Sequence, residues 1–176
     1  GATYDFQGWV VDADYLYTQG QDMAYYVDVS QEKVGETVLG LPIYDFADGR
    51  GESNFMLTNS NQDPEAHVLS LSVRKYFDNG WDLLAGYAYT DAEDVSPMTS
   101  SVAGSNFSNV ALNDIVEPEA ATSNYVTPHR FTFRLGYRNT FFGDNETRFS
   151  LYSFAKEGRP QSYVMGSDAL EGDQRF

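Results

Sequence analysis

Residues 81–89 read Trp81-Asp-Leu-Leu-Ala-Gly-Tyr-Ala-Tyr89 and alternate between two kinds of side chain. The odd positions are apolar and end on aromatic rings, whereas the even positions are mostly small or charged. Successive side chains of a strand point to opposite faces, so this stretch predicts a strand with one apolar face. Residues 9–17 and 131–137 repeat the pattern.

The aromatic ends of this stretch have a spacing typical of a membrane strand. Trp81 and Tyr89 are eight residues apart, which is about 26 Å along a strand. A tilt of about 40° reduces this to roughly 20 Å of depth, close to the ~25 Å apolar band of transmembrane β-barrels. A half-buried strand of a soluble sandwich also alternates, but we favour the barrel. The expected lipid-facing aromatic belt comprises Trp9, Tyr15, Tyr17, Trp81, Tyr87, Tyr89, Phe131, Phe133 and Tyr137.

The composition of the 176 residues excludes several classes of protein. The absence of cysteine excludes disulfides and cysteine-ligated metals. A net charge of −15 argues against a nucleic-acid partner, which requires a basic surface. No run of about 20 apolar residues is present, so a transmembrane helix is not expected. Aromatic residues make up 15% of the chain, as expected of a barrel with aromatic girdles.

Short and long connections alternate along the chain. The turns at Asp78-Asn79-Gly80 and at 143–146 are short, because Asn-Gly and Gly-Asp favour tight hairpins. Bacterial outer-membrane barrels likewise have short periplasmic turns and long extracellular loops. We therefore predict an all-β fold, an antiparallel meander of about six strands. The expected strands are about 5–18, 66–77, 81–91, 129–141, 147–156 and 161–166, with long loops at about 19–65, 92–128 and 157 onward.

The chain is expected to be an incomplete segment of a large transmembrane β-barrel. Its first residues carry no signal peptide, although an outer-membrane protein must be exported. Six strands are too few for a barrel of useful size, and an open edge in lipid leaves backbone groups unpaired. Beyond the hairpin rhythm we expect no internal repeat.

Several segments resemble a known family. They are Met56-Leu-Thr-Asn59, Tyr76-Phe-Asp-Asn-Gly-Trp81, Ala88-Tyr-Thr90, Ser123-Asn-Tyr-Val-Thr-Pro-His-Arg-Phe131 and Glu157-Gly-Arg-Pro-Gln-Ser-Tyr-Val164. Together they resemble the C-terminal half of TonB-dependent outer-membrane receptors, most closely the Oar-like branch. Glu157 and Gln161 depart from the pattern of that branch. None of the segments is a catalytic motif, and we expect no enzymatic activity.

The resemblance implies a 22-stranded barrel in the bacterial outer membrane, closed by an N-terminal plug domain. It implies uptake of a bulky, unidentified extracellular ligand, driven by the inner-membrane TonB complex. The plug domain and the segment that contacts TonB are not in this chain, so contact with that complex would be made through a missing N-terminal part. The expected partners are therefore outer-membrane lipid, the TonB complex and the extracellular ligand.

A basic strip is expected on the face of the sheet that points into the barrel lumen, formed by Arg130, Arg134, Arg138 and Arg148. The strip would contact the plug or guide an anionic ligand. The alternative is pairing with acids on neighbouring strands such as Asp82, which keeps buried charge compensated. We favour the pairing.

Other polar residues are weighed as binding sites. Arg159 and Tyr163 are candidate ligand contacts, because an arginine beside aromatic rings can hold a carboxylate or a sugar. The alternative, which we favour, is that these residues only anchor their loop on the barrel.

Two acidic clusters each resemble half of a Ca²⁺ site. We favour the alternative that they are solvated charges of the loops, and we expect no bound metal and no cofactor. These clusters are Asp91, Glu93 and Asp94, and Asp168, Glu171 and Asp173.

The two histidines, His67 and His129, are expected at the outer rim, since no zinc-binding spacing is present. Phe176 lacks a preceding strand pattern, so we interpret it as an accidental end.

Two other functions compete with the receptor: a passive porin or adhesive barrel, and a soluble all-β module that binds carbohydrate. A soluble module would hide the face of Trp81, Tyr87 and Phe133 under a second sheet.

Overall fold

The structure is a computed structural model that describes residues 1–163. Those residues form two compact units, each built from segments distant in the sequence. Unit 1 contains residues 1–18, 66–92 and 125–160, and unit 2 contains residues 19–65, 93–124 and 161 onward. The fold is all-β with antiparallel pairing, as predicted, and its only described helix is α1 (Ala103–Ser108).

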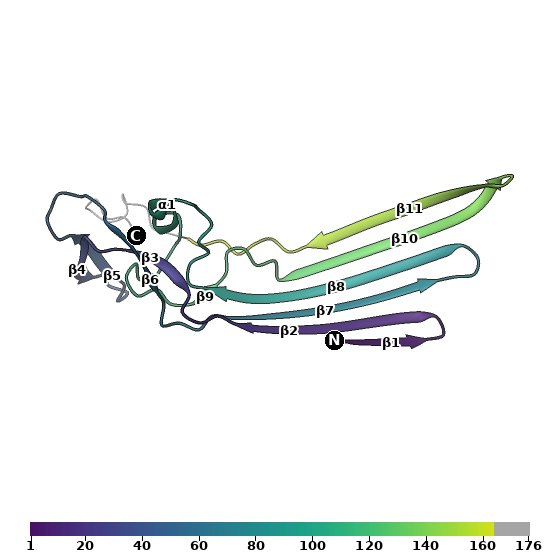
Figure 1. Cartoon of the computed structure of the whole chain (residues 1–176), viewed down its shortest axis with the longest axis horizontal. Coiled ribbons are helices and arrows are strands. Elements are labelled where there is room, and N and C mark those ends of the chain that lie inside the picture. Colours follow the sequence, from purple (N-terminus) through teal and green to yellow (C-terminus); the bar gives the residue numbers. More distant parts are fainter. Residues whose placement is uncertain (164–176) are drawn as a thin grey trace. The chain divides into compact units, whose positions relative to one another are not determined.

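Unit 1 is an open sheet of long strands in an up-and-down order (Figure 1). The strands are ordered β1-β2-β7-β8-β10-β11, and no described strand joins β11 back to β1. Their bounds are β1 (Ala2–Phe6), β2 (Trp9–Gln19), β7 (Glu65–Tyr76), β8 (Trp81–Asp94), β10 (His129–Phe142) and β11 (Asn145–Lys156). Four of the predicted strands, at 66–77, 81–91, 129–141 and 147–156, match β7, β8, β10 and β11 closely.

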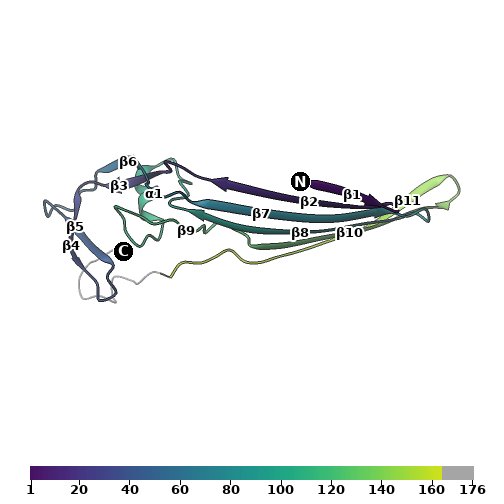
Figure 2. The same cartoon turned by 90° about the horizontal axis from the view of Figure 1, so that it is seen from below.

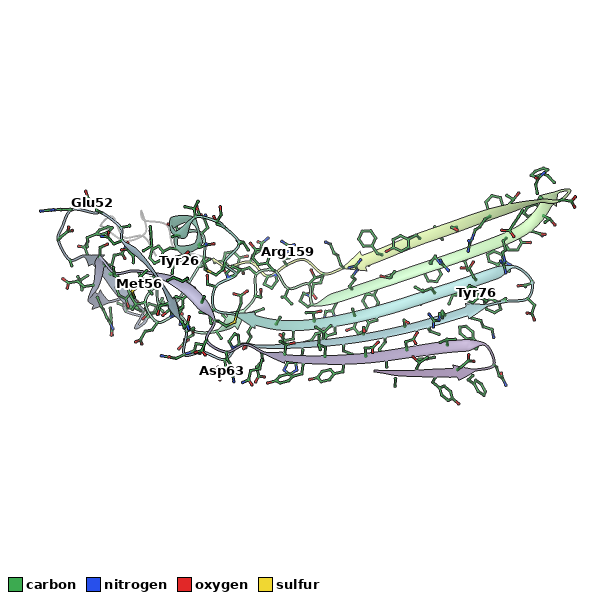
Figure 3. All side chains as sticks on the ribbon, in the orientation of Figure 1. Tyr26, Glu52, Met56, Asp63, Tyr76 and Arg159 are labelled. Atoms are coloured by element: carbon green, nitrogen blue, oxygen red, sulfur yellow. The ribbon has the colours of Figure 1, made fainter. Side chains whose placement is uncertain are left out.

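The strands of unit 1 lie in a single curved layer (Figure 2). Side chains line every strand of this layer (Figure 3), and successive side chains of a strand point to opposite faces. The apolar side chains are accordingly exposed, with Trp81 at 41%, Phe131 at 55% and Phe133 at 36%. A second sheet does not cover this face within the described residues, in contrast to a soluble sandwich.

Three tight turns lie at the same end of the sheet, which we call the turn end (Figure 1). Gly80 has φ of +87° and its amide donates to the Phe77 carbonyl, as in a type I turn followed by a glycine bulge. Gly143 has φ of +64° between β10 and β11, where the pairing of Phe142 with Asn145 leaves a two-residue turn. Both predicted turns are therefore present. We call the opposite end of the sheet the loop end.

The predicted strand at 5–18 is present as β2 from Trp9 onward, but a third turn separates its first residues into β1. Gln7 and Gly8 both have positive φ, at 50° and 74°, and connect β1 to β2 as an antiparallel hairpin. Positive φ at both central residues is the type I′ geometry that asparagine and glycine favour and glutamine seldom adopts. The sequence therefore carried little signal for this turn. The predicted strand at 161–166 is not formed at residues 161–163, and its remainder lies outside the described residues.

Unit 2 is formed by the predicted long loops, which are more ordered than expected. It holds two small antiparallel sheets and a two-residue strand, β9 (Ala121–Thr122), paired with the end of β8. The strands of the two sheets are β3 (Ala24–Asp28) with β6 (Phe55–Asn59), and β4 (Gln31–Glu36) with β5 (Pro42–Phe46). Tyr25, Val27 and Val95 are buried, and the ring of Phe55 packs on Phe107 of α1. No helix within residues 1–163 has the length and apolarity needed to cross a membrane.

Candidate functional site

The apolar face of unit 1 carries aromatic rings at both ends and mainly aliphatic side chains between them. Cross-strand pairs share a face, so the register places Leu71 beside Tyr87, and Tyr87 beside Phe131. On β2, Trp9 contacts Phe77 and Tyr15 contacts His67, so the odd positions of β2 lie on this face too. The nine residues predicted as the aromatic belt therefore lie on one face. The side chains between the two aromatic bands are Val11, Ala13, Leu69, Leu71, Val73, Leu83, Ala85, Phe133, Leu135, Leu151 and Ser153.

The aromatic band at the turn end is a set of direct ring contacts. Trp81 packs against Tyr137 with 4.6 Å between ring centroids, and Trp9 meets Phe77 edge to face at 6.1 Å. The Lys75 ammonium lies 4.7 Å from the centre of the Trp9 ring. Rings with a polar edge or a nearby cation suit a boundary between an apolar and an aqueous phase.

The aromatic band at the loop end contains two equivalent clusters of tyrosine and histidine. The Tyr15 hydroxyl is 2.7 Å from His67 Nδ1, and the Tyr87 hydroxyl is 2.8 Å from His129 Nδ1. In each cluster a second tyrosine, two residues further along the strand, also packs on the histidine ring. These contacts join Tyr17 to His67 at 5.1 Å and Tyr89 to His129 at 5.2 Å. Both histidines lie at the rim of the sheet, as predicted.

The two clusters reveal an internal repeat, and the prediction that none exists beyond the hairpin rhythm is wrong. Residues 8–18 and 80–90 share glycine and tryptophan at their start and Ala-x-Tyr-x-Tyr-Thr at their end. The next strand in the sheet then begins near a histidine that contacts both tyrosines. The sequence contained this signal, but the long connection between tyrosine and histidine concealed the pairing.

The polar face of unit 1 is organised around one buried carboxylate. Asp82 is 4% exposed, and its Oδ2 accepts a hydrogen bond from Arg134 Nη2 at 2.7 Å. Its Oδ1 lies 3.4 Å from Arg148 Nη2. Gly136 lies beside Asp82 in the register, and a Cβ there would come within 2.3 Å of the carboxylate. Glycine at this position leaves the space that the ion pairs occupy.

Two of the four arginines in the predicted basic strip therefore have their charge balanced by an acid. Arg134 and Arg148 are paired with Asp82, as favoured from the sequence. Arg130 and Arg138 share their face but form no ion pair with any described acid. Besides Asp82, this face carries Asp5 on β1 and Asp12 on β2, and Thr3 and Ser72 donate hydrogen bonds to Asp12.

A buried aspartate organises one part of unit 2. Asp28 is 2% exposed, and its Oδ1 accepts hydrogen bonds from the backbone amides of Ser30 and Asn54 at 3.1 and 2.9 Å. Burial raises the pKa of Asp28, but these hydrogen bonds, together with those from the Ser30 and Ser53 side chains, outweigh it and leave the pKa below its ordinary value. Asp28 therefore remains charged and fixes the chain between β3 and β6.

A second aspartate joins the two long segments of unit 2. Asp114 Oδ1 accepts hydrogen bonds from the amides of Val116 and Glu117 and from the Tyr44 hydroxyl, the last at 2.8 Å. Burial, and then the charge and hydrogen bond of Asp114, raise the pKa of Tyr44. The Tyr25 hydroxyl donates to the Val116 carbonyl at 2.7 Å. Residues from 19–65 are thus hydrogen-bonded to residues from 93–124.

The candidate ligand contacts have different surroundings. The Arg159 guanidinium carbon lies 5.3 Å from the centre of the Tyr125 ring, within unit 1. This contact agrees with the favoured anchoring of the loop. Tyr163 is 97% exposed. Arg159 belongs to unit 1 and Tyr163 to unit 2.

The acidic candidates for Ca²⁺ do not converge. Asp91, Glu93 and Asp94 belong to β8, where Asp94 points to the face opposite the other two. In the part of the chain that the structure describes, no three histidine or acidic side chains gather in a metal-binding arrangement. Asp168, Glu171 and Asp173, like Phe176, lie outside the described residues.

Comparison of the chain with family models, curated proteins and solved structures finds no match. The arrangement of the sheet and its two faces is therefore the basis for inferring function.

Proposed function

We propose that this chain forms part of a β-barrel in a bacterial outer membrane, and that the apolar face of unit 1 contacts lipid. The observation that carries this proposal is the pair of aromatic bands, with aliphatic side chains exposed between them. In water a bare apolar face of this size would favour aggregation, whereas lipid would cover it. The aromatic bands would then lie at the two membrane interfaces, where tyrosine and tryptophan are favoured.

We further propose that the barrel belongs to a TonB-dependent receptor that takes up a bulky ligand. The segments resembling the Oar-like branch support this finer assignment, and so does the alternation of tight turns with long connections. A passive or adhesive barrel would share the lipid-facing sheet. The folded long connections of unit 2 favour a binding role at the cell surface for either kind of barrel.

Fluorescence quenching by brominated lipids tests the membrane contact. The chain has two tryptophans, and both lie in the band at the turn end. In vesicles, the single-tryptophan variants W9F and W81F should be quenched more by bromine near the headgroup than by bromine deep in the acyl chains. A tryptophan introduced by Leu135→Trp into a W9F/W81F background should show the reverse, because Leu135 lies between the bands.

Ser150→Trp in the same background is the matched control, because Ser150 pairs with Gly136 on the polar face. Little quenching is expected there. A protein that remains soluble and is not quenched at any of these positions contradicts the proposal. Dependence on TonB is tested separately, by whether ligand uptake by the full protein stops in cells that lack the inner-membrane complex.

A further inference from the structure

Cationic side chains follow the polar face of the last two strands of unit 1 from one end to the other. Arg130, Arg134 and Arg138 occupy every second position of that face on β10, and β11 adds two further cations. We call this set the cationic row: Arg130, Arg134, Arg138, Arg148 and Lys156. It is a concentration of positive charge in a chain whose net charge is −15.

Two pairs within the cationic row place like charges directly opposite each other. Arg130 is the cross-strand partner of Lys156, and Arg138 is the partner of Arg148. Like charges at such positions destabilise a sheet. A sheet selected for stability alone would place an acid at one member of each pair.

Asp82 neutralises only the middle of the row. Its two oxygens are engaged by Arg134 and Arg148, so its single charge serves two guanidinium groups. Within residues 1–163, no acid lies within ion-pair distance of Arg130, Arg138 or Lys156. The uncompensated charge is thus concentrated at the two ends of the row.

On β10 the positions between the cations carry small side chains, whereas on β11 the exposed rings of Tyr152 and Phe154 lie between Arg148 and Lys156. Thr132 and Gly136 separate the arginines of β10, and Gly86 is the neighbour of Thr132 on β8. Ser150 lies beside Gly136 on β11. The cationic heads of β10 therefore border small side chains on their own strand, where a bound molecule can approach the backbone.

We propose that the cationic row binds a solute with at least two anionic groups, carboxylates or phosphates. The pair Arg130–Lys156 at the loop end would take one group, and Arg138 at the turn end would receive the solute next. Arginine binds both anions through paired hydrogen bonds. This inference rests on the proposed function, in which the polar face lines the aqueous interior, and it names the chemical class of what enters there.

Calorimetry on the protein in detergent tests the inference, with tripolyphosphate and citrate as probes. Both probes should bind, and the double variant R130Q/K156Q should weaken binding at least about tenfold, or about 1.4 kcal/mol. K33Q/R50Q is the matched control, because it removes two exposed cations of unit 2, outside the row, and should leave affinity unchanged. Equal weakening in both variants would mean attraction to general positive charge and would overturn the proposal.

Thermal unfolding provides a second readout that separates binding from structure. Without a probe, R130Q/K156Q should be as stable as the wild type or more stable, because a like-charge pair has been removed. With tripolyphosphate, the melting temperature of the wild type should rise and that of the variant should not. A variant destabilised without a probe would assign the pair a structural role and contradict the inference.

Failure of this inference is distinguishable from failure of the proposed function. If the tryptophan variants are quenched by brominated lipid but neither probe binds, the barrel stands and the ligand class is wrong. Selective binding of a synthetic acidic peptide, without binding of either small anion, would assign the row to a polypeptide partner and likewise overturn the proposal.

Discussion

Asp82 on β8 and Arg134 on β10 are joined by a 2.7 Å hydrogen bond between Oδ2 and Nη2. The second oxygen of Asp82 meets Arg148 on β11, so one carboxylate connects three neighbouring strands on the polar face. The side chain of Asp82 is only 6% exposed, whereas those of Arg134 and Arg148 are 38% and 54% exposed. The anion is therefore buried while both cations reach water. Solvent thus partly screens the attraction between Asp82 and the two arginines.

Asp82→Asn should reduce the free energy of unfolding by about 1–3 kcal/mol, because two guanidinium groups lose their shared charge. Denaturant unfolding of the protein in detergent, followed by tryptophan fluorescence, measures the loss. Asp5→Asn is the control, since Asp5 lies on the same face but is exposed on the edge strand β1. A double-mutant cycle with Arg134→Gln should give a positive coupling energy; additive effects would contradict a direct interaction.

Gly136→Ala should destabilise the sheet by about 1–3 kcal/mol, because a Cβ at that position displaces the buried carboxylate of Asp82. Gly86→Ala is the matched control on the same face of the neighbouring strand. A Cβ at Gly86 meets only the Leu71 carbonyl oxygen at 3.7 Å, an ordinary contact. The same unfolding measurement should therefore show little loss for Gly86→Ala, and equal losses in the two variants would refute the steric explanation.

Strand periodicity predicted the framework of unit 1 because each long strand has two unlike environments on its faces. Alternation in 81–89 and 131–137 therefore gave both the strands and the face on which each side chain lies. The same logic identified Asp82 as a partner for the arginines, since even positions of β8 and β10 share a face. These features depend on a period of two residues, which the sequence shows directly.

Long-range pairing was not predictable in the same way. The contacts of Tyr15 with His67 and of Tyr44 with Asp114 join residues far apart in the sequence, and no local pattern specifies them. The Gln7–Gly8 turn was missed for a different reason, because glutamine rarely has positive φ. Here the turn joins the paired strands β1 and β2, and Lys75 Nζ donates a hydrogen bond to the Gln7 carbonyl. Unit 2 was predicted as loops because strands of five or six residues are too short for alternation to stand out.

Gly80→Ala should cost more stability than Gly143→Ala, although both glycines have positive φ. The backbone conformation alone costs alanine about 1–2 kcal/mol at either turn. At Gly80 a Cβ would also lie 2.2 Å from the Arg138 carbonyl oxygen, whereas the space around Gly143 is open. The free energies of unfolding of the two variants measure the difference. Equal values would mean that the backbone near Arg138 moves aside freely.

Asp28→Asn should destabilise unit 2 at neutral pH by about 1–2 kcal/mol, because a charged acceptor of several hydrogen bonds becomes neutral. The pKa of Asp28 is lower in the folded protein than its ordinary value of 3.8. Its contribution is therefore fully present above pH 3.8 and is lost as the pH falls through the lower folded pKa.

Urea unfolding at decreasing pH should therefore show a loss of stability below pH 3.8 in the wild type that is smaller in Asp28→Asn. Asp63→Asn is the control, because Asp63 is an exposed aspartate of the same unit (Figure 3). Its acid-induced loss should match that of the wild type. If the Asp28 variant instead loses stability in acid as steeply as the wild type, other carboxylates carry the pH dependence and the buried cluster around Asp28 does not.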